Sequence, residues 1–343
     1  MLTPPGGGIA TDPLRILVMA TGPFAVPMFT ALTHSPHRVV AVVTRPDHAP
    51  PGRRPAPNPV RAAAAAAGLP ILDPEHVNAP EAVAAVASAR ADLFVVCDYG
   101  QILSRDLLAV APLGGLNLHG SLLPRHRGAA PVQWAILAGD PITGVSVIHM
   151  TPALDAGNVI AVRATPIGPH ETAAELEPRL AELGAGAVLE AIERLEAAVA
   201  AGGSPAAAGT PQDPARATRA PRLAKADGVV DWAQPAARIE RLRRALEPWP
   251  RAATFFTRGD GRRQRLVLED LAVVPPGDLP AGAATAAPGC VLATGGPRLV
   301  VACGDGTALE IRRLVPEGRR SMSAAEFLHG SPLRPGARLG DDA

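Results

Sequence analysis

The chain has 343 residues, of which 47% are hydrophobic and 19% charged, and its formal net charge is +1. This composition indicates a globular protein rather than a disordered one, and no apolar run approaches the roughly 20 residues needed to cross a bilayer. Three scattered cysteines without a CxxC pair argue against a disulfide framework or a metal site, and with no secretory signal visible we expect a reducing, cytoplasmic environment.

The first half alternates strand-like and helix-like segments. Short continuous apolar runs at 15–20, 39–44 and 93–97 are typical of strands buried on both faces. Helix-compatible segments at 59–68 and 79–91 lie between them. This order predicts βαβ units and an α/β fold with a Rossmann-like, doubly wound, mostly parallel sheet.

Three further segments follow before the second half. Residues 144–150 alternate apolar and polar side chains, which predicts a strand with one less buried face. Residues 171–201 predict a long helix, interrupted near Gly184. Residues 201–215 are rich in Gly, Ala and Pro and have no periodicity, so we expect a linker between two domains.

The second half predicts one helix and then a run of strands. Pro235 begins a helix over 234–247, in which Ile239, Leu242 and Leu246 share one face. From about residue 251, short strand-like runs separated by Gly and Pro predict a small, OB-like β-barrel. The expected organisation is a disordered tail at 1–14, an α/β domain at 15–200, a linker at 201–215 and a β-barrel domain at 216–340.

Charge is unevenly distributed along the chain. Residues 213–265 hold thirteen basic and six acidic side chains. This excess favours an anionic partner for the second half. The alternative is an ordinary solvated surface in an arginine-rich protein, in which Lys225 is the only lysine.

A candidate catalytic group begins with Asn117 and His119, at the end of a predicted strand. Because side chains alternate along a strand, both project from one face, near the carboxyl edge where parallel sheets bind ligands. The amide can polarise a carbonyl group and the imidazole can move a proton. Asp155 follows the strand at 144–150, and from a neighbouring strand end it could orient His119. The alternative is a structural histidine beside a turn-forming asparagine.

The signatures of several other enzyme classes are missing. No serine, cysteine or lysine occupies an activated nucleophile motif, and the glycines at 6–8 lack the lysine of a P-loop. The turn after the first strand has one glycine where a dinucleotide fingerprint needs three. The remaining chemistry is acyl transfer in which the substrates supply both the nucleophile and the leaving group.

Residues 116–160 resemble the core of the 10-formyltetrahydrofolate-dependent formyltransferases, and most of all the members that act on methionyl-tRNA. The Asn-x-His and LD-x-G motifs of the family match Asn117, His119 and Asp155, and its SLLP motif matches residues 121–124. The resemblance covers most of the chain, although Asp98 stands where the family often has alanine before Tyr-Gly.

The resemblance implies a reaction and its site residues. A formyl group would pass from the co-substrate 10-formyltetrahydrofolate to the free α-amine of initiator methionyl-tRNA, without a metal, in a monomer. Asn117, His119 and Asp155 would be catalytic. The folate-binding residues would be Ser121, Leu122, Leu123, Pro124, Val96, Tyr99, Gly100 and Ile102. The tRNA-binding residues would be Arg53, Arg54, Arg222, Lys225, Arg241 and Arg244.

Two other functions compete with this one. A related formyltransferase could act on another amine, such as an amino-sugar nucleotide. The chain could also be a non-catalytic RNA-binding protein. The basic, β-rich second half argues against the first alternative, and the complete set of Asn117, His119 and Asp155 argues against the second.

Overall fold

The computed structural model describes residues 12–47, 58–258, 261–294 and 298–340. Contacts within the chain divide it into two compact units. The first unit comprises Met1–Pro131, Ile142–Pro166 and Glu177–Pro221, and the second comprises Val132–Pro141, Ile167–Leu176 and Arg222–Ala343. None of the helices within the described residues is long and apolar enough to cross a membrane.

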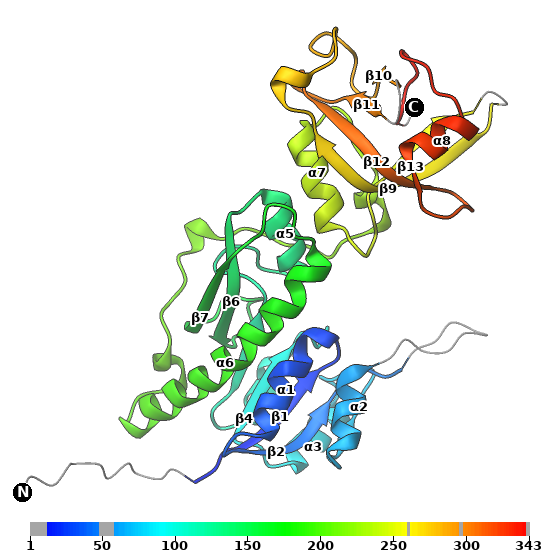
Figure 1. The fold of residues 1–343 in the computed structure, drawn as a ribbon. Coiled ribbons are helices and arrows are strands. Elements are labelled where there is room, and N and C mark those ends of the chain that lie inside the picture. The colour runs from blue at the N-terminus through cyan, green and yellow to red at the C-terminus, as the bar shows by residue number, and fades with distance from the viewer. Residues whose placement is uncertain (1–11, 48–57, 259–260, 295–297, 341–343) are drawn as a thin grey trace, which may run out of the picture. The chain divides into compact units, whose positions relative to one another are not determined.

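Seven strands of the first unit form one sheet in the order β3-β2-β1-β4-β5-β6-β7. Figure 1 labels β1, β2, β4, β6 and β7 of this sheet. Their bounds are β1 Arg15–Ala20, β2 Arg38–Val43, β3 Ile71–Leu72, β4 Leu93–Cys97, β5 Gly115–His119, β6 Ile142–His149 and β7 Val159–Pro166. Strands β1 to β5 are parallel, whereas β6 is antiparallel to both neighbours. The order reverses between β1 and β4, where doubly wound sheets bind ligands. The predicted fold class is therefore confirmed.

Short helices connect the parallel strands. They are α1 Val26–Thr33, α2 Pro59–Ala66, α3 Pro80–Ser88 and α4 Arg105–Leu108, and further along the chain come α5 Pro131–Ala138 and α6 Ala173–Ala200. The start of α2 shows why a helix forms there: Pro59 occupies its first turn and Asn58 Oδ1 accepts a hydrogen bond from Arg61 N. Such a cap satisfies one of the free N–H groups at a helix start.

Helix α6 is continuous over 28 residues, so the predicted interruption near Gly184 is wrong. Gly184 is buried, and a Cβ atom there would lie 2.6 Å from Leu118 Cδ2 on β5. The glycine therefore lets the helix approach the sheet closely. Its role is packing rather than chain breaking.

Strand β6 is buried on both faces, which corrects the expectation of one less buried face. It lies between β5 and β7 in the interior of the sheet. Two of its polar side chains, Thr143 and Ser146, are buried with the apolar ones. Alternation of residue type along β6 therefore does not reflect solvent exposure.

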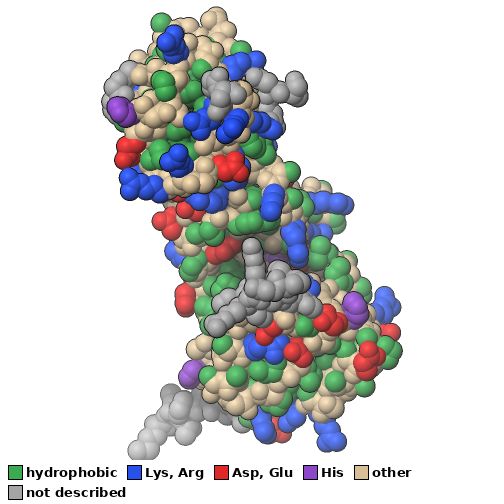
Figure 2. Space-filling view, turned by 90° about the vertical axis from the view of Figure 1, so that its right-hand side faces the viewer, with side chains coloured by type: hydrophobic (Ala, Val, Ile, Leu, Met, Phe, Trp, Pro, Cys, Tyr) green, Lys and Arg blue, Asp and Glu red, His purple; other side chains and the backbone are tan. Residues whose placement is uncertain are grey.

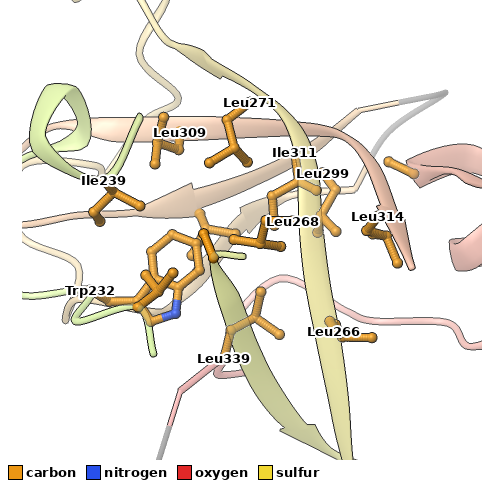
Figure 3. Packing of buried hydrophobic residues seen from close by; sticks show 14 of the residues in the cluster. Trp232, Ile239, Leu266, Leu268, Leu271, Leu299, Leu309, Ile311, Leu314 and Leu339 are labelled. Atoms are coloured by element: carbon orange, nitrogen blue, oxygen red, sulfur yellow. The ribbon is translucent and has the colours of Figure 1, made fainter. Parts of the chain in front are cut away.

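The second unit contains an antiparallel sheet with two helices after residue 222, and it also includes most of α5 and the first residues of α6. The sheet has the order β10-β11-β12-β9-β8, with β13 paired to β12. The strands are β8 Ala253–Thr257, β9 Arg263–Val273, β10 Val291–Ala293, β11 Leu299–Ala302, β12 Ala308–Pro316 and β13 Met322–Ser323, and the helices are α7 Ala236–Ala245 and α8 Ala324–Gly330. Their apolar faces meet in one core that includes Trp232, Ile239 and Leu268 (Figure 3).

Residues 201–215, predicted to be a linker, pack within the first unit. Thr210 exchanges two backbone hydrogen bonds of 2.8 Å with Val159 on β7. Further on, Arg127 N donates to Thr218 O and Ala220 N donates to Arg127 O. The last segment of the first unit ends at Pro221.

Candidate active site

Strand β5 carries Asn117 and His119 on the same face of the sheet. Asn117 lies beside Val96 of β4 and Ile148 of β6, and it is half-buried. Within the described residues its side-chain amide makes no hydrogen bond. An amide whose donors are unused is available to a carbonyl group of a substrate.

His119 is 5% exposed and is held from both sides. Its Nε2 lies 2.9 Å from His126 O, and because a carbonyl oxygen only accepts, Nε2 must carry a proton. Its Nδ1 lies 3.7 Å from Asp155 Oδ2, an ion-pair contact longer than a hydrogen bond. Only the doubly protonated ring can donate toward both partners. The geometry therefore accommodates an imidazolium at His119.

Asp155 reaches His119 by a different route from the one expected. Because β6 runs antiparallel to β5, its last residue, His149, lies opposite Leu116 rather than His119. The connection between β6 and β7 brings the carboxylate to His119 instead. Asp155 adopts a positive φ of 49°, and its Oδ2 accepts a 2.9 Å hydrogen bond from Gly128 N.

The turn after β5 is held by hydrogen bonds to buried serines. Ser121 Oγ donates to Arg125 O at 2.6 Å, and Ser146 Oγ donates to Ser121 O at 2.8 Å. Leu123 N in turn donates to Ser146 Oγ at 3.0 Å. Ser146 sits on β6 opposite His119, so one hydroxyl fixes the start of the 121–124 turn against the sheet.

The other residues expected to bind folate differ in their exposure. Val96 and Tyr99 are buried in the core beside Leu103. Burial raises the pKa of Tyr99 to about 12, although the nearby Arg45 charge opposes this shift. Gly100 is exposed with a φ of 80°, and Ile102 is 67% exposed. Of these four, only Gly100 and Ile102 present a surface to a ligand.

The basic residues expected to bind tRNA also differ. Arg53 and Arg54 lie outside the described residues. Arg222 and Lys225 are exposed, and Lys and Arg side chains are visible on the second unit in Figure 2. Arg241 is half-buried against the end of α5, where a side chain at Gly139 would collide with its guanidinium.

Arg244, which was also expected to contact tRNA, is buried. It is 6% exposed, and its Nε donates to both carboxylate oxygens of Glu240, at 2.8 and 2.9 Å. Its Nη1 donates to Glu171 O at 2.9 Å. Two of the three guanidinium nitrogens therefore have partners within the second unit.

Sequence reasoning missed three contributors to the site: Ser146, Gly128 and Gln212. Gln212 Nε2 donates to Asp155 O and to Gly157 O, both at 2.8 Å. None belongs to a motif with a chemical signature, and only a polar residue within an apolar strand, at Ser146, could have drawn attention. Among the described residues, no three His, Cys, Asp or Glu side chains gather as a metal site would require.

Comparisons with known proteins identify the family of the chain. Residues 14–192 match the family model described as formyl transferase, and residues 222–332 match the model of the formyl transferase C-terminal domain. A methionyl-tRNA formyltransferase of Rhodopirellula baltica is 44% identical, covering 96% of this chain and 97% of the relative. One of Desulfotalea psychrophila is 40% identical, with coverages of 93% and 94%.

Solved structures support the fold. HypX from Aquifex aeolicus in complex with tetrahydrofolic acid has a TM-score of 0.56 and 19% identity to this chain. The alignment covers 92% of this chain and 47% of HypX, so this chain spans about half the length of HypX. An N-formyltransferase from Helicobacter canadensis in complex with folinic acid and dTDP-3-aminofucose has a TM-score of 0.58 and 12% identity, with coverages of 87% and 98%.

The two family models together span most of the sequence, and the relatives match over nearly their full length. The chain belongs to the formyl transferase family, and the two relatives given above are methionyl-tRNA formyltransferases.

Proposed function

We propose that the chain transfers a formyl group from 10-formyltetrahydrofolate to the α-amine of initiator methionyl-tRNA, with Asn117, His119 and Asp155 as its catalytic residues. Family membership supplies the reaction, because this chain matches both domain models and aligns over nearly the full length of a relative named methionyl-tRNA formyltransferase. The observation that carries the site is the 3.7 Å contact between His119 Nδ1 and Asp155 Oδ2, on the face of the sheet that also bears Asn117.

Each of the three side chains has a distinct part in this proposal. The formyl donor supplies an electrophilic carbon, and the neutral amine of the acceptor attacks it directly. Negative charge then develops on the formyl oxygen, where the Asn117 amide and the protonated His119 donate hydrogen bonds. One such donor is typically worth about 3–4 kcal/mol in the transition state. As the intermediate collapses, the bond between the formyl carbon and the folate nitrogen breaks and His119 Nδ1 passes a proton to that departing nitrogen, while Asp155 stabilises the imidazolium. The neutral imidazole then takes up the proton that the attacking amine must lose to become a formamide.

The folate co-substrate would lie along the carboxyl ends of β1, β4 and β5. The turn formed by Ser121, Leu122, Leu123 and Pro124 would bound one side of its pocket. Ile102 and Gly100 would meet the pterin with an exposed apolar side chain and a backbone without a Cβ atom. Val96 and Tyr99 would form the buried wall beneath it. This set fits a flat, largely apolar ring with polar edges.

The tRNA would bind through phosphate contacts that position it. Arg222 and Lys225 are exposed and lie in the segment with the largest excess of positive charge. Arg53 and Arg54 stay in the proposal on the family resemblance alone. Phosphate contacts carry no sequence information, so they would contribute affinity and sensitivity to salt.

A formyl-transfer assay with purified variants tests the catalytic assignment. We expect Asn117→Ala, His119→Ala and Asp155→Ala each to lower turnover with charged initiator tRNA at least about 100-fold while the fold stays intact. His34→Ala, an exposed histidine of the first unit, is the control and should retain full activity. Wild-type turnover in any of the three variants would remove that residue from the mechanism.

The same assay separates the alternative functions. Charged initiator tRNA, free methionine and an amino-sugar nucleotide are compared as acceptors with the unmodified protein. Formylation of the tRNA alone supports the proposal. Preference for the sugar amine would reassign the substrate, and tRNA binding without any formyl transfer would make the chain a non-catalytic RNA-binding protein.

A further inference from the structure

Residues 210–220, called the strap below, run along the two loops that surround His119. At its start, Thr210 pairs with Val159 at the beginning of β7. At its end, the strap pairs with Arg127 in a parallel bridge through Arg219. The strap therefore joins the loop that carries Asp155 to the loop that carries His126, and both of these residues contact His119.

Gln212 is the strap residue that contacts both sides. Its Nε2 donates to Asp155 O and Gly157 O, each at 2.8 Å. Its Oε1 accepts from Arg127 Nε at 3.1 Å and from Arg127 Nη2 at 2.6 Å. Both N–H groups and both lone pairs of the amide are thus used. In a flipped amide, the NH₂ group would face the Arg127 guanidinium and the oxygen would face the two carbonyl oxygens. This network therefore defines the orientation of the Gln212 amide.

The residue that Gln212 holds is one whose backbone needs support. Asp155 has a φ of 49°, a conformation that costs free energy for any residue with a Cβ atom. Two bonds from Gln212 fix the carbonyl group of Asp155 itself and that of Gly157, two residues further along the loop. Asp155 Oδ2 is fixed separately by Gly128 N at 2.9 Å. Backbone and side chain of Asp155 are therefore anchored by different partners.

The opposite partner of His119 depends on the same strap. Thr218 Oγ1 accepts from His126 N at 2.8 Å, and Arg127 N donates to Thr218 O at 2.8 Å. Gly128 has a φ of 135°, and a Cβ atom there would lie 2.3 Å from Ala220 O, so only glycine permits this close approach. The His126 carbonyl that receives His119 Nε2 is thus placed by backbone pairing, and Gln212 couples that loop to Asp155.

We propose that Gln212 is a positioning residue for the reaction, holding the Asp155 carboxylate at its working distance from His119 through the backbone of the 155–157 loop. This inference rests on the proposed function, because it assumes that Asp155 acts on His119. Gln212 itself touches neither the reacting atoms nor the imidazole, so its effect passes through Asp155.

Three variants separate positioning from simple bracing of the strap. Gln212→Leu removes every bond of the amide. Gln212→Glu keeps an acceptor for Arg127 and strengthens it with charge, but turns an unprotonated oxygen toward the carbonyls of Asp155 and Gly157. Asp213→Ala is the matched control, because the exposed Asp213 side chain caps Ala215 N within the strap and contacts neither loop.

We expect Gln212→Leu and Gln212→Glu to lower kcat about 10-fold or more, since small misplacements of a catalytic group are costly, while the KM for each substrate stays within about two-fold. The pH dependence of kcat should shift in both variants, and Asp213→Ala should match the unmodified protein in both readouts. Wild-type kcat for Gln212→Glu would overturn the proposal, because a residue that only braces Arg127 tolerates a carboxylate.

A double-mutant cycle with Asp155 distinguishes the positioning role of Gln212 from the proposed catalytic role of Asp155. In an Asp155→Ala background, Gln212→Leu should cause no further loss of kcat, because the two residues act as one unit. Full activity of Asp155→Ala would refute the assigned catalytic role. An impaired Asp155→Ala protein whose kcat falls again on adding Gln212→Leu would leave that role standing and refute the positioning role.

Discussion

His119 is constrained at each nitrogen by a different kind of partner. The His126 carbonyl fixes the proton on Nε2, and the Asp155 carboxylate faces Nδ1 at 3.7 Å. Because Nε2 is already committed to a hydrogen bond, Nδ1 is the nitrogen that can exchange a proton with a substrate. The Asp155 carboxylate can therefore act in two separable ways. Its negative charge can stabilise an imidazolium, and its hydrogen bond from Gly128 N holds the loop in place.

Asp155→Asn separates these contributions at the scale of the residue. Asparagine tolerates a positive φ and can still accept from Gly128 N, so the loop should keep its conformation. It cannot stabilise an imidazolium, so we expect turnover to fall at least about 100-fold while the melting temperature stays unchanged. Steady-state kinetics check the expected fall in turnover, and thermal unfolding checks the unchanged melting temperature. Equal turnover in the asparagine variant would show that the charge of Asp155 is not used.

The elements could be predicted where one local pattern decided them. Continuous apolar runs located β1, β2 and β4 within a residue or so, and Asn117 and His119 fall on one strand face as alternation requires. Direction and partnership could not be predicted from such patterns. Nothing in residues 144–150 indicates that β6 runs antiparallel to β5. The helical pattern around Arg244 likewise does not show that the Arg244 guanidinium forms an ion pair with Glu240, one helical turn away.

Helix α6 offers a test at the scale of the element, because it holds two glycines in different surroundings. Gly184→Ala would place a Cβ atom 2.6 Å from Leu118 Cδ2. Overpacking costs about 1–3 kcal/mol, which exceeds the roughly 1 kcal/mol that alanine gains in a helix. We expect the free energy of unfolding to fall by about 1 kcal/mol, measured by urea denaturation followed by circular dichroism.

Gly186→Ala, two residues further along the same helix, is the matched control. A Cβ atom at this exposed position meets no atom within 4 Å, so only the helix propensity changes. The free energy of unfolding should rise by about 0.5–1 kcal/mol. Equal effects of the two substitutions would mean that the close contact between α6 and Leu118 does not constrain the helix.

At the scale of the whole molecule, the family and the fold class could be predicted from the sequence because specific motifs occur in both halves. The structure of the segment that connects the halves could not be predicted in this way. Composition at 201–215 suggests a free segment, but its backbone pairs with β7 and Gln212 donates a hydrogen bond to the loop that carries Asp155. A Gly/Ala/Pro-rich sequence lacks periodicity whether it is solvated or bound to a neighbouring loop. Long-range hydrogen bonds decide between these states.

The excess of basic residues in the second half gives the last prediction, which concerns tRNA rather than catalysis. Arg222→Ala and Lys225→Ala, alone and together, remove exposed charges that we propose to contact phosphates. Removing one such phosphate interaction should raise the KM for tRNA and lower the slope of log KM against log salt by about 1. The KM for folate should not change.

Arg38→Ala, exposed on the first unit and outside the 213–265 segment, controls for the removal of one positive charge. If the Arg38 variant changes the salt slope as much as the Arg222 variant does, net charge explains the tRNA dependence and no phosphate interaction need be assigned to residues 222–225.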